Sequence, residues 1–304
     1  MKIRPKRLQP GDTVGVLAPC SPLAMETLPE KIDFLEELGL KVKIGKTVGL
    51  TGKYLSGTDD ERIEDLHEMI EDKEIKAIFC LRGGYGAARI ADKIDYQLLT
   101  ENPKIFWGFS DVTYFHNAFQ EYSNIVTFHG PMLSSVVQKK LSDFSKRMFY
   151  QLFTPFEIQY DERISPLHTI VPGAIRGEIT GGNLHRLMST MGTKFEFDAR
   201  GKILLFEDIG EPLQKIDGML NQLRLARKLD QAAGFVIGDF AELEKGASIE
   251  DVWAIFEEYL KPLGKPAVAG FKIGHCEPNI AVPLGVDAIL DADTKLLRIL
   301  PGVE

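Results

Sequence analysis

Ser110 occupies a position from which a hydroxyl could act as a nucleophile. It ends the apolar run WGFS and is followed at once by DVTYFHNAF, whose spacing predicts a helix. At the carboxyl end of a parallel strand it would face the ligand crevice, and the free N–H of Asp111 could stabilise a tetrahedral oxyanion. The G-x-S-x-G pattern of nucleophile elbows is half present, because Gly108 precedes the serine but Val112 replaces the second glycine. A plain helix N-cap is the competing interpretation.

A glycine-rich turn, LRGGYGAAR, follows another predicted strand and is expected to open into the same crevice. Gly83 and Gly84 allow close approach of a ligand, so their N–H groups could supply the second oxyanion donor. The dinucleotide pattern G-x-G-x-x-G lacks its third glycine, and no G-x-x-x-x-G-K-[ST] is present. A dehydrogenase is therefore poorly supported. The competing interpretation is a tight turn that only needs glycine dihedrals.

A serine nucleophile needs a general base, and the chain has six histidines. Three are expected at the surface or in packing, because they lie in helical patterns or in the charged stretch after residue 154: His67, His116 and His168. His185 begins a short predicted helix. His129 and His275 each end a predicted strand, and the residues alone favour them about equally.

Glu207 is the candidate for the carboxylate that orients the base, because it follows four apolar residues at the mouth of a predicted strand. Asp208 is the nearest alternative, and a solvated strand end is the competing interpretation. Cys20 and Cys276 could provide a thiol, but neither stands at a strand-to-helix elbow that would lower its pKa. No H-E-x-x-H, clustered His and Cys spacing or calcium loop occurs, so we expect no metal and no cofactor.

The first half alternates short apolar runs with amphipathic patterns, which predicts a parallel sheet flanked by helices. Strands are expected at residues 13–19, 41–46, 75–83, 104–110 and 125–131. Helices are expected at residues 28–39, 59–72, 84–94, 111–122 and 137–152. The fold class predicted for residues 1–155 is a flavodoxin-like or Rossmann-like α/β domain that carries the serine.

The second half does not keep this regular alternation of strands and helices. Residues 156–172 are predicted to be an inter-domain linker, and residues 173–304 a smaller α/β domain with mixed β structure. Strands are expected at 173–182, 202–210, 234–240 and 266–275, with a closing hairpin at 286–300. Helices are expected at 183–192, 214–234 and 248–264.

Composition excludes several classes of protein. The 304 residues carry a net charge of −8 without a basic stripe, so nucleic acid is not an expected partner. No signal peptide is recognised, and no window approaches the roughly 20 apolar residues of a membrane-spanning helix. Three cysteines without C-x-x-C spacing fit a reducing compartment, so the expected location is the cytoplasm.

The motifs APCSP, LRGGYGA, WGFSDVT, FHGPM, RGEITGGNL, LLFEDIGE and GHCEPN occur in this order. Together they resemble the LD-carboxypeptidase family, serine peptidases that include muropeptide LD-carboxypeptidases and microcin C7 self-immunity peptidases. The resemblance spans nearly the whole chain. It implies that Ser110 is the nucleophile, that Glu207 and His275 complete the triad from the C-terminal domain, and that the protein forms a homodimer.

The resemblance also implies an oxyanion hole made by the N–H of Asp111 and one from Gly83 or Gly84. A carboxypeptidase must bind the terminal carboxylate of its substrate, which an arginine does by bidentate pairing. The residues predicted to contact substrate are Arg82, Tyr85, Asn183 and Arg186.

The substrate implied is a murein tetrapeptide, from which the terminal D-alanine is released during peptidoglycan recycling. A microcin-type immunity peptidase that cleaves a peptidyl-nucleotide is an alternative, since it would share the triad and differ in substrate loops within residues 154–180. A third interpretation is a non-catalytic module that binds a small molecule in the same crevice.

Overall fold

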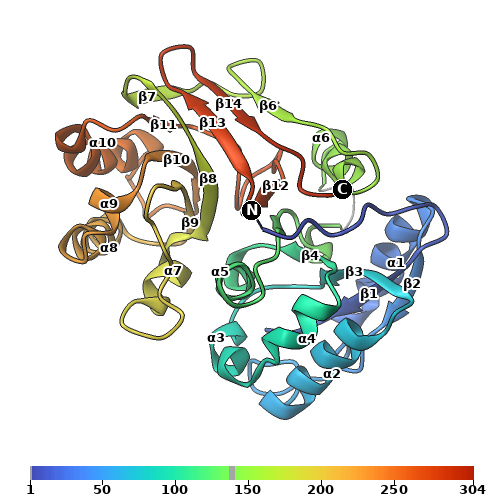
Figure 1. Ribbon diagram of the computed structural model, residues 1–304. Helices are drawn as coiled ribbons and strands as arrows, with labels where there is room; N and C mark the ends of the chain where they lie inside the picture. The colour runs from blue at the N-terminus through green and yellow to red at the C-terminus, as the bar shows by residue number, and fades with distance from the viewer. Residues whose placement is uncertain (1, 137–140) are drawn as a thin grey trace.

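Two β-sheets form the framework of the chain (Figure 1). The computed structural model describes residues 2–136 and 141–304. The first sheet has the order β12-β5-β4-β3-β1-β2, with β12 antiparallel to β5 and the other strands parallel. Without β12 this is the 2-1-3-4-5 order of flavodoxin-like sheets, so the predicted fold class of the first half is confirmed.

The elements of this half follow the predicted alternation. The strands are β1 (Thr13–Leu17), β2 (Lys41–Ile44), β3 (Ile75–Cys80), β4 (Ile105–Gly108), β5 (Thr127–His129) and β12 (Val282–Leu284). The helices are α1 (Leu28–Glu37), α2 (Asp59–Glu71), α3 (Ala87–Ile90), α4 (Tyr96–Glu101), α5 (Thr113–Tyr122) and α6 (Asp143–Arg147). The 3₁₀ turns are η1 (Met25–Thr27), η2 (Ala91–Lys93), η3 (Ser110–Val112), η4 (Leu133–Ser135) and η5 (Met148–Leu152).

Local sequence explains where these elements start and how they align. Helix α2 begins at a capping box, in which the Thr58 hydroxyl accepts from the N–H of Glu61 and the Glu61 carboxylate accepts from the N–H of Thr58. Strand β4 is buried along its whole length, as expected for a parallel strand covered on both faces. Gly108 pairs with His129 of β5, so the carboxyl ends of β4 and β5 lie at one edge of the sheet.

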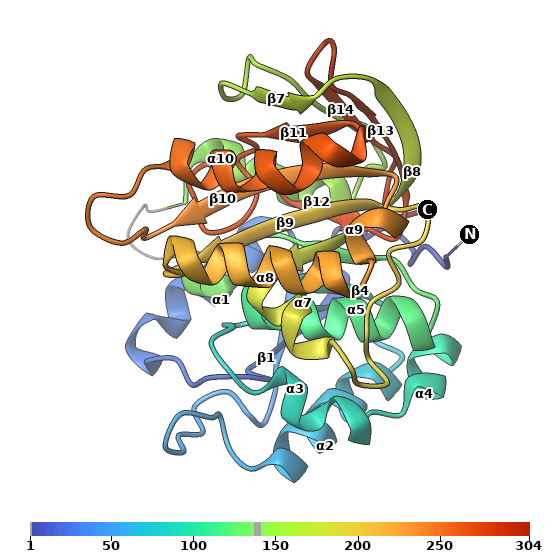
Figure 2. The same ribbon diagram turned by 90° about the vertical axis from the view of Figure 1, so that its left-hand side faces the viewer.

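The second sheet is mixed and curls over the first half (Figure 2), with the order β6-β14-β13-β8-β9-β10-β11-β7. Its strands are β6 (Ile158–Tyr160), β7 (His168–Val171), β8 (Ala174–Asn183), β9 (Ile203–Ile209), β10 (Gly234–Ala241), β11 (Ala267–Ala269), β13 (Asp287–Asp291) and β14 (Leu296–Ile299). Its helices are α7 (Leu184–Thr190), α8 (Leu213–Leu225), α9 (Lys228–Gln231) and α10 (Ile249–Leu260), with the 3₁₀ turn η6 (Lys261–Leu263). Strands β8 to β11 run parallel, which confirms the predicted mixed α/β class.

The two halves share one apolar core. A single buried cluster contains Trp107 and Phe128 from the first sheet together with Leu205 and Val236 from the second. Strand β12 comes from the second half of the chain and completes the first sheet, and both termini lie where the halves meet (Figure 1). This junction holds the ends of β4 and β9, the elements that carry the predicted site residues. No helix among the described residues has both the length and the apolar content needed to cross a bilayer.

Several elements differ from the prediction. Helix α4 was not predicted, because its six residues are too few for a helical period. The helix predicted at 214–234 is divided into α8 and α9 by Arg227, whose φ of 61° is left-handed. Strand β11 ends at Ala269, so His275 lies in the following loop and not at a strand end. Of the helix predicted at 137–152, residues 137–140 lie outside the described part, and α6 and η5 occupy residues 143–152.

The segment 156–172 contains two strands of the second sheet, β6 and β7. Strand β6 has three residues and pairs with β14, which lies more than a hundred residues further along the chain. Strand β7 has four residues and pairs with β11, nearly a hundred residues away. Such short strands are stabilised by distant partners and leave no local period in the sequence. The division of the chain into two domains at this segment stays a prediction.

Candidate active site

Ser110 stands in a sharp turn between β4 and α5. Its φ of 63° lies in the left-handed region, which non-glycine residues rarely adopt. Gly108 makes the turn possible, because a Cβ at that position would lie 3.0 Å from the side chain of Val112 and 3.1 Å from that of Cys80. Strained backbone of this kind clusters at functional sites. The turn therefore has the backbone of a nucleophile elbow although the second glycine of the motif is missing.

The glycine-rich turn after β3 touches this elbow. A Cβ at Gly83 would lie 3.1 Å from Cβ of Ser110 and 3.3 Å from the backbone nitrogen of Asp111. The absence of a side chain at Gly83 thus leaves space beside the serine. Gly84 has a φ of 97°, and a Cβ there would lie 2.5 Å from Oγ of Ser21. Ser21 belongs to the APCSP motif, and its Oγ accepts from the N–H of Tyr85 at 3.1 Å, a contact that was not predicted from the sequence.

His275 and Glu207 form a hydrogen-bonded pair. Nδ1 of His275 lies 2.7 Å from Oε2 of Glu207, and Glu207 is fully buried in the second half of β9. Gly274 allows the loop to approach β9, because a Cβ there would lie 2.5 Å from Oε2 of Glu207. An imidazole held by a buried carboxylate has a fixed tautomer, with Nε2 free for other partners.

The environment of His275 favours its protonated form. Burial lowers the pKa of His275, but the charge and hydrogen bond of Glu207 outweigh burial, and Asp208 and Asp239 add to the effect. The net pKa lies above the usual 6.5. The imidazole is therefore mostly neutral, and able to accept a proton, only when the pH is above this raised pKa.

Phe109 lies between Ser110 and His275, because it precedes the serine in the chain and its ring contacts the imidazole. The rings of Phe109 and His275 have centroids 4.6 Å apart, so the imidazole lies against the residue that precedes the serine. Within the described residues the Ser110 hydroxyl has no hydrogen bond to His275. In unliganded enzymes such bonds are often long and form only with substrate. The structure thus places the turn after β4, which carries Ser110, beside the pair formed by Glu207 of β9 and His275 of the loop after β11.

His129, the rival base, lies close by but inside the protein. Its ring packs edge-on against Phe109 at 5.7 Å, and its exposed fraction is 0%. Neither of its ring nitrogens has a hydrogen-bond partner among the described residues. Burial, and then the charges of His116 and His275, hold the pKa of His129 well below 6.5. His129 is a neutral, enclosed imidazole without an orienting carboxylate.

The other carboxylate and histidine candidates hold helix α7. Asp208 accepts hydrogen bonds from Nδ2 of Asn183 at 2.8 Å and from the N–H of His185 at 2.9 Å. Burial and the neighbouring Glu207 raise the pKa of Asp208 to about 6. The ring of His185 is hydrogen-bonded to Glu211. Asn183, a predicted substrate contact, is almost fully buried and caps α7 by accepting from the N–H of Arg186 at 3.1 Å.

Arg186 connects the two turns around Ser110. Its Nε lies 3.2 Å from Oδ1 of Asp111, and its guanidinium donates to the carbonyl of Gly84 at 3.3 Å. It also lies over the exposed ring of Tyr85, 6.0 Å from the centroid. Arg82 is exposed and donates to the carbonyl of Pro22 at 3.0 Å. The role of the Asp111 side chain, which orders both turns, was not foreseen from the sequence.

The cysteines are poor candidates for the nucleophile. All three are free thiols. Burial raises the pKa of Cys80 and Cys276, and burial with the charge of Asp111 raises that of Cys20. The thiols are therefore protonated at neutral pH, whereas nucleophilic cysteines act as thiolates. Residues 2–136 and 141–304 hold no group of three His, Cys, Asp or Glu side chains arranged for a metal ion.

We expect the buried histidines to make the protein sensitive to mild acid. Burial lowers the pKa of His116 to about 4, whereas the unfolded chain takes up this proton near 6.5. The free energy of unfolding is therefore highest above pH 6.5 and falls as the pH drops. For a histidine with a pKa of about 4 in the folded protein and 6.5 in the unfolded chain, the loss at pH 5 is about 2 kcal/mol. In urea unfolding at pH 7 and pH 5, His129→Phe should lose less stability than wild type. An equal loss in both proteins would show that His129 is not held neutral.

A strained serine elbow beside a histidine–carboxylate pair, where a flavodoxin-like sheet meets a mixed sheet, is an arrangement suited to nucleophilic hydrolysis. The chain belongs to the LD-carboxypeptidase family. Residues 14–130 match the LD-carboxypeptidase N-terminal domain, and residues 176–290 match the LD-carboxypeptidase C-terminal domain. The family predicted from the sequence motifs is therefore confirmed.

The chain is similar to known proteins over more than nine tenths of their length. The chain is 48% identical to the "Probable murein peptide carboxypeptidase" of Bacillus subtilis, with 100% of this chain and 96% of that protein covered. It is 29% identical to the "Murein tetrapeptide carboxypeptidase" of Pseudomonas aeruginosa, with 92% and 93% covered. The crystal structure of an MccF-like protein from Bacillus anthracis has a TM-score of 0.90 at 26% identity, with 98% and 99% covered.

Proposed function

We propose that the protein is a serine carboxypeptidase that hydrolyses the LD-peptide bond before the terminal D-alanine of murein tetrapeptides. The observation that carries the proposal is the buried pair of His275 and Glu207 beside the strained elbow of Ser110. Membership of the LD-carboxypeptidase family and the names of the relatives support the substrate class.

In the proposed reaction His275 is the general base. Nε2 takes the hydroxyl proton of Ser110 while the serine oxygen attacks the scissile carbonyl. Glu207 keeps the other proton on Nδ1 and stabilises the imidazolium that forms. His275 then gives the proton to the amine of D-alanine, which leaves. Water hydrolyses the acyl-enzyme with His275 again as the base, and Ser110 is regenerated.

The developing oxyanion needs two donors. We assign them to the backbone N–H groups of Asp111 and of Gly83 or Gly84, which lie on the two turns that meet at Ser110. Arg186 links these turns, because it pairs with Asp111 on one and donates to the carbonyl of Gly84 on the other. A donor placed before the reaction stabilises the transition state without reorganisation.

For the terminal carboxylate of the substrate we propose an arginine at the edge of the site. Arg186 is already engaged by Asp111 and by the carbonyl of Gly84. Among the residues that the structure describes, Arg82 donates only to the carbonyl of Pro22, which leaves most of its donors for a bidentate pair. Tyr85, 42% exposed, would form part of the rim.

The test is release of D-alanine from a murein tetrapeptide ending in L-diaminopimelyl-D-alanine, with chelator present throughout. Wild type should release D-alanine and should not act on a matched tetrapeptide ending in L-alanine. If the tetrapeptide is not cleaved but a peptidyl-nucleotide is, the function is that of a microcin-type immunity peptidase. Binding of the tetrapeptide without cleavage of either compound would indicate a non-catalytic binding module.

We expect Glu207→Gln to lower kcat by about 10³- to 10⁴-fold, because the amide keeps the shape of the side chain but no longer fixes the tautomer of His275. The pH profile gives a second readout. Glu207 raises the pKa of His275, so wild-type activity should fall as the pH drops through a value above 6.5. The residual activity of Glu207→Gln should persist to lower pH. An unshifted acid limb would contradict the proposed role of Glu207.

We further propose that the protein works as a homodimer in the cytoplasm, as part of peptidoglycan recycling. The support is the resemblance to the family and the three free cysteines, which suit a reducing compartment. Light scattering of the purified protein coupled to size-exclusion chromatography would measure the oligomeric state directly.

A further inference from the structure

A hollow of about 470 Å³ lies at the edge of the first sheet opposite to Ser110. Its walls include residues that precede the amino ends of three parallel strands, β1, β3 and β4, and part of the N-terminal segment. Lys104 precedes β4, whereas Ser110 follows its carboxyl end. The hollow is therefore separate from the proposed active site.

The hollow is positively charged in a chain whose net charge is −8. Its lining includes six basic and three acidic side chains. The basic residues are Arg4, Lys6, Arg7, Lys73, Lys76 and Lys104. Within the described part of the chain, none of these six side chains forms an ion pair with a carboxylate. A concave surface with excess charge of one sign concentrates small ions of the other sign.

Lys104 is the strongest feature of this hollow. Only 4% of it is exposed, and Nζ donates to the carbonyls of Asp72 and Ile75, each at 2.7 Å. An ammonium has three N–H donors, so one is left for another partner. A buried charge without a counter-ion is costly. Burial, followed by repulsion from Lys76, lowers the pKa of Lys104 to about 8, with Asp72 opposing and Lys73 assisting.

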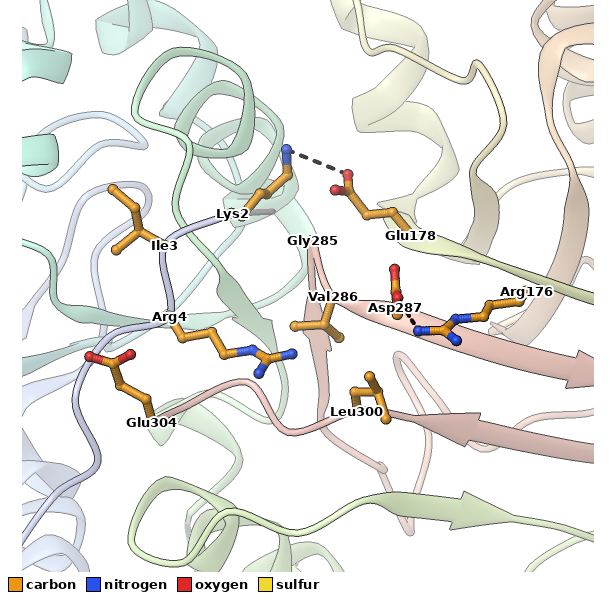
Figure 3. A pocket seen from close by; sticks show the side chains of 10 residues that line it. All are labelled: Lys2, Ile3, Arg4, Arg176, Glu178, Gly285, Val286, Asp287, Leu300 and Glu304. Carbon is orange, nitrogen blue, oxygen red and sulfur yellow. Dashed lines mark hydrogen bonds and ion pairs between the residues drawn. The ribbon is translucent and has the colours of Figure 1, made fainter.

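A neighbouring hollow of about 590 Å³ provides a contrast (Figure 3). There Lys2 points to Glu178 at 3.4 Å, and Arg176 points to Asp287 at 2.7 Å. Its three basic and three acidic side chains balance. Arg4 lines both hollows. The described cations of the first hollow have no such carboxylate partners. Lys73 donates to Oδ1 of Asn102 and Lys76 to the carbonyl of Lys73 at 2.6 Å, which leaves their charges without a counter-ion and available to an external anion.

We propose that the hollow at the amino ends of β1, β3 and β4 binds a phosphate-bearing small molecule. A phosphate group carries up to two charges and several acceptor oxygens, which suits guanidinium groups such as those of Arg4 and Arg7 together with a lysine ammonium. The volume exceeds that of a phosphate ion, and Ile3 and Pro103 give apolar surface for the rest of the ligand.

The test is isothermal titration of wild type with pyrophosphate, and in parallel with citrate. We expect one pyrophosphate per chain and weaker binding of citrate. Arg7→Ala should weaken pyrophosphate binding about tenfold, the effect of one charge-assisted contact. Arg176→Ala removes an arginine that lines the neighbouring hollow but not this one, so it is the matched control and should bind like wild type. Absence of saturable binding at about 10 mM pyrophosphate would overturn the proposal.

Two further results would also overturn it. An equal loss in Arg7→Ala and Arg176→Ala would show attraction by general surface charge, and equal affinity for citrate would show that phosphate is not selected. Lys104→Met should lose binding, and Lys76→Ala serves in its place where Lys104→Met does not fold. Affinity for pyrophosphate should also fall between pH 7 and pH 9, because free Lys104 loses its proton near pH 8.

Discussion

Replacing Ser110 by alanine is expected to lower kcat for D-alanine release by about 10⁴- to 10⁶-fold, the range found when a serine nucleophile is removed from a triad. The reason lies in the mechanism, since Ser110 forms the acyl-enzyme and the neighbouring hydroxyl of Thr113 is buried and accepts from the N–H of Asn183. The measurement is the steady-state rate of D-alanine release at saturating tetrapeptide. The substrate should still bind, because the oxyanion donors and the arginines are unchanged.

Folding must be separated from chemistry in this variant. Ser110 has a φ of 63°, which alanine adopts no more easily than serine, so Ser110→Ala should change the urea midpoint little. Ser189→Ala, at an exposed serine on α7, is the matched control and should retain full activity. If Ser110→Ala released D-alanine as fast as wild type, Ser110 would not be the nucleophile.

The elbow was predictable because its signals are local. An apolar strand, a serine and an amphipathic helix follow one another between Ile105 and Tyr122, and the structure has β4, η3 and α5 there. The alternation of strands and helices in the first half was predictable for the same reason, because each element is encoded by consecutive residues. Each strand and each longer helix leaves a signal in its own residues, so the alternation and the parallel sheet were predictable, whereas the order of the strands in the sheet was not predicted.

The pairing of His275 with Glu207 was not predictable from local pattern. The two residues are 68 positions apart, and they meet because Gly274 lets an irregular loop lie against β9. A loop carries no hydrophobic period, so the residues alone could not separate His275 from His129. Only the order of motifs shared with the family indicated the choice. Burial, which distinguishes the two histidines, appears once the chain is folded.

His275→Ala should lower kcat about as far as Ser110→Ala, by roughly 10⁴- to 10⁶-fold, because the members of a triad act as a unit. His129→Phe should stay within about tenfold of wild type, since this ring has no hydrogen bond among the described residues and phenylalanine preserves its packing against Phe109. Both rates are measured as D-alanine release above pH 7, where His275 is the more active base.

Added imidazole distinguishes a lost base from lost structure. His275→Ala leaves a space beside Phe109 in which free imidazole can accept the serine proton, so part of the activity should return as imidazole is added. Ser110→Ala cannot be rescued in this way, because its nucleophile is gone. If His129→Phe were the slower variant and recovered with imidazole, the base would be His129. The buried pair of His275 and Glu207 would then be structural.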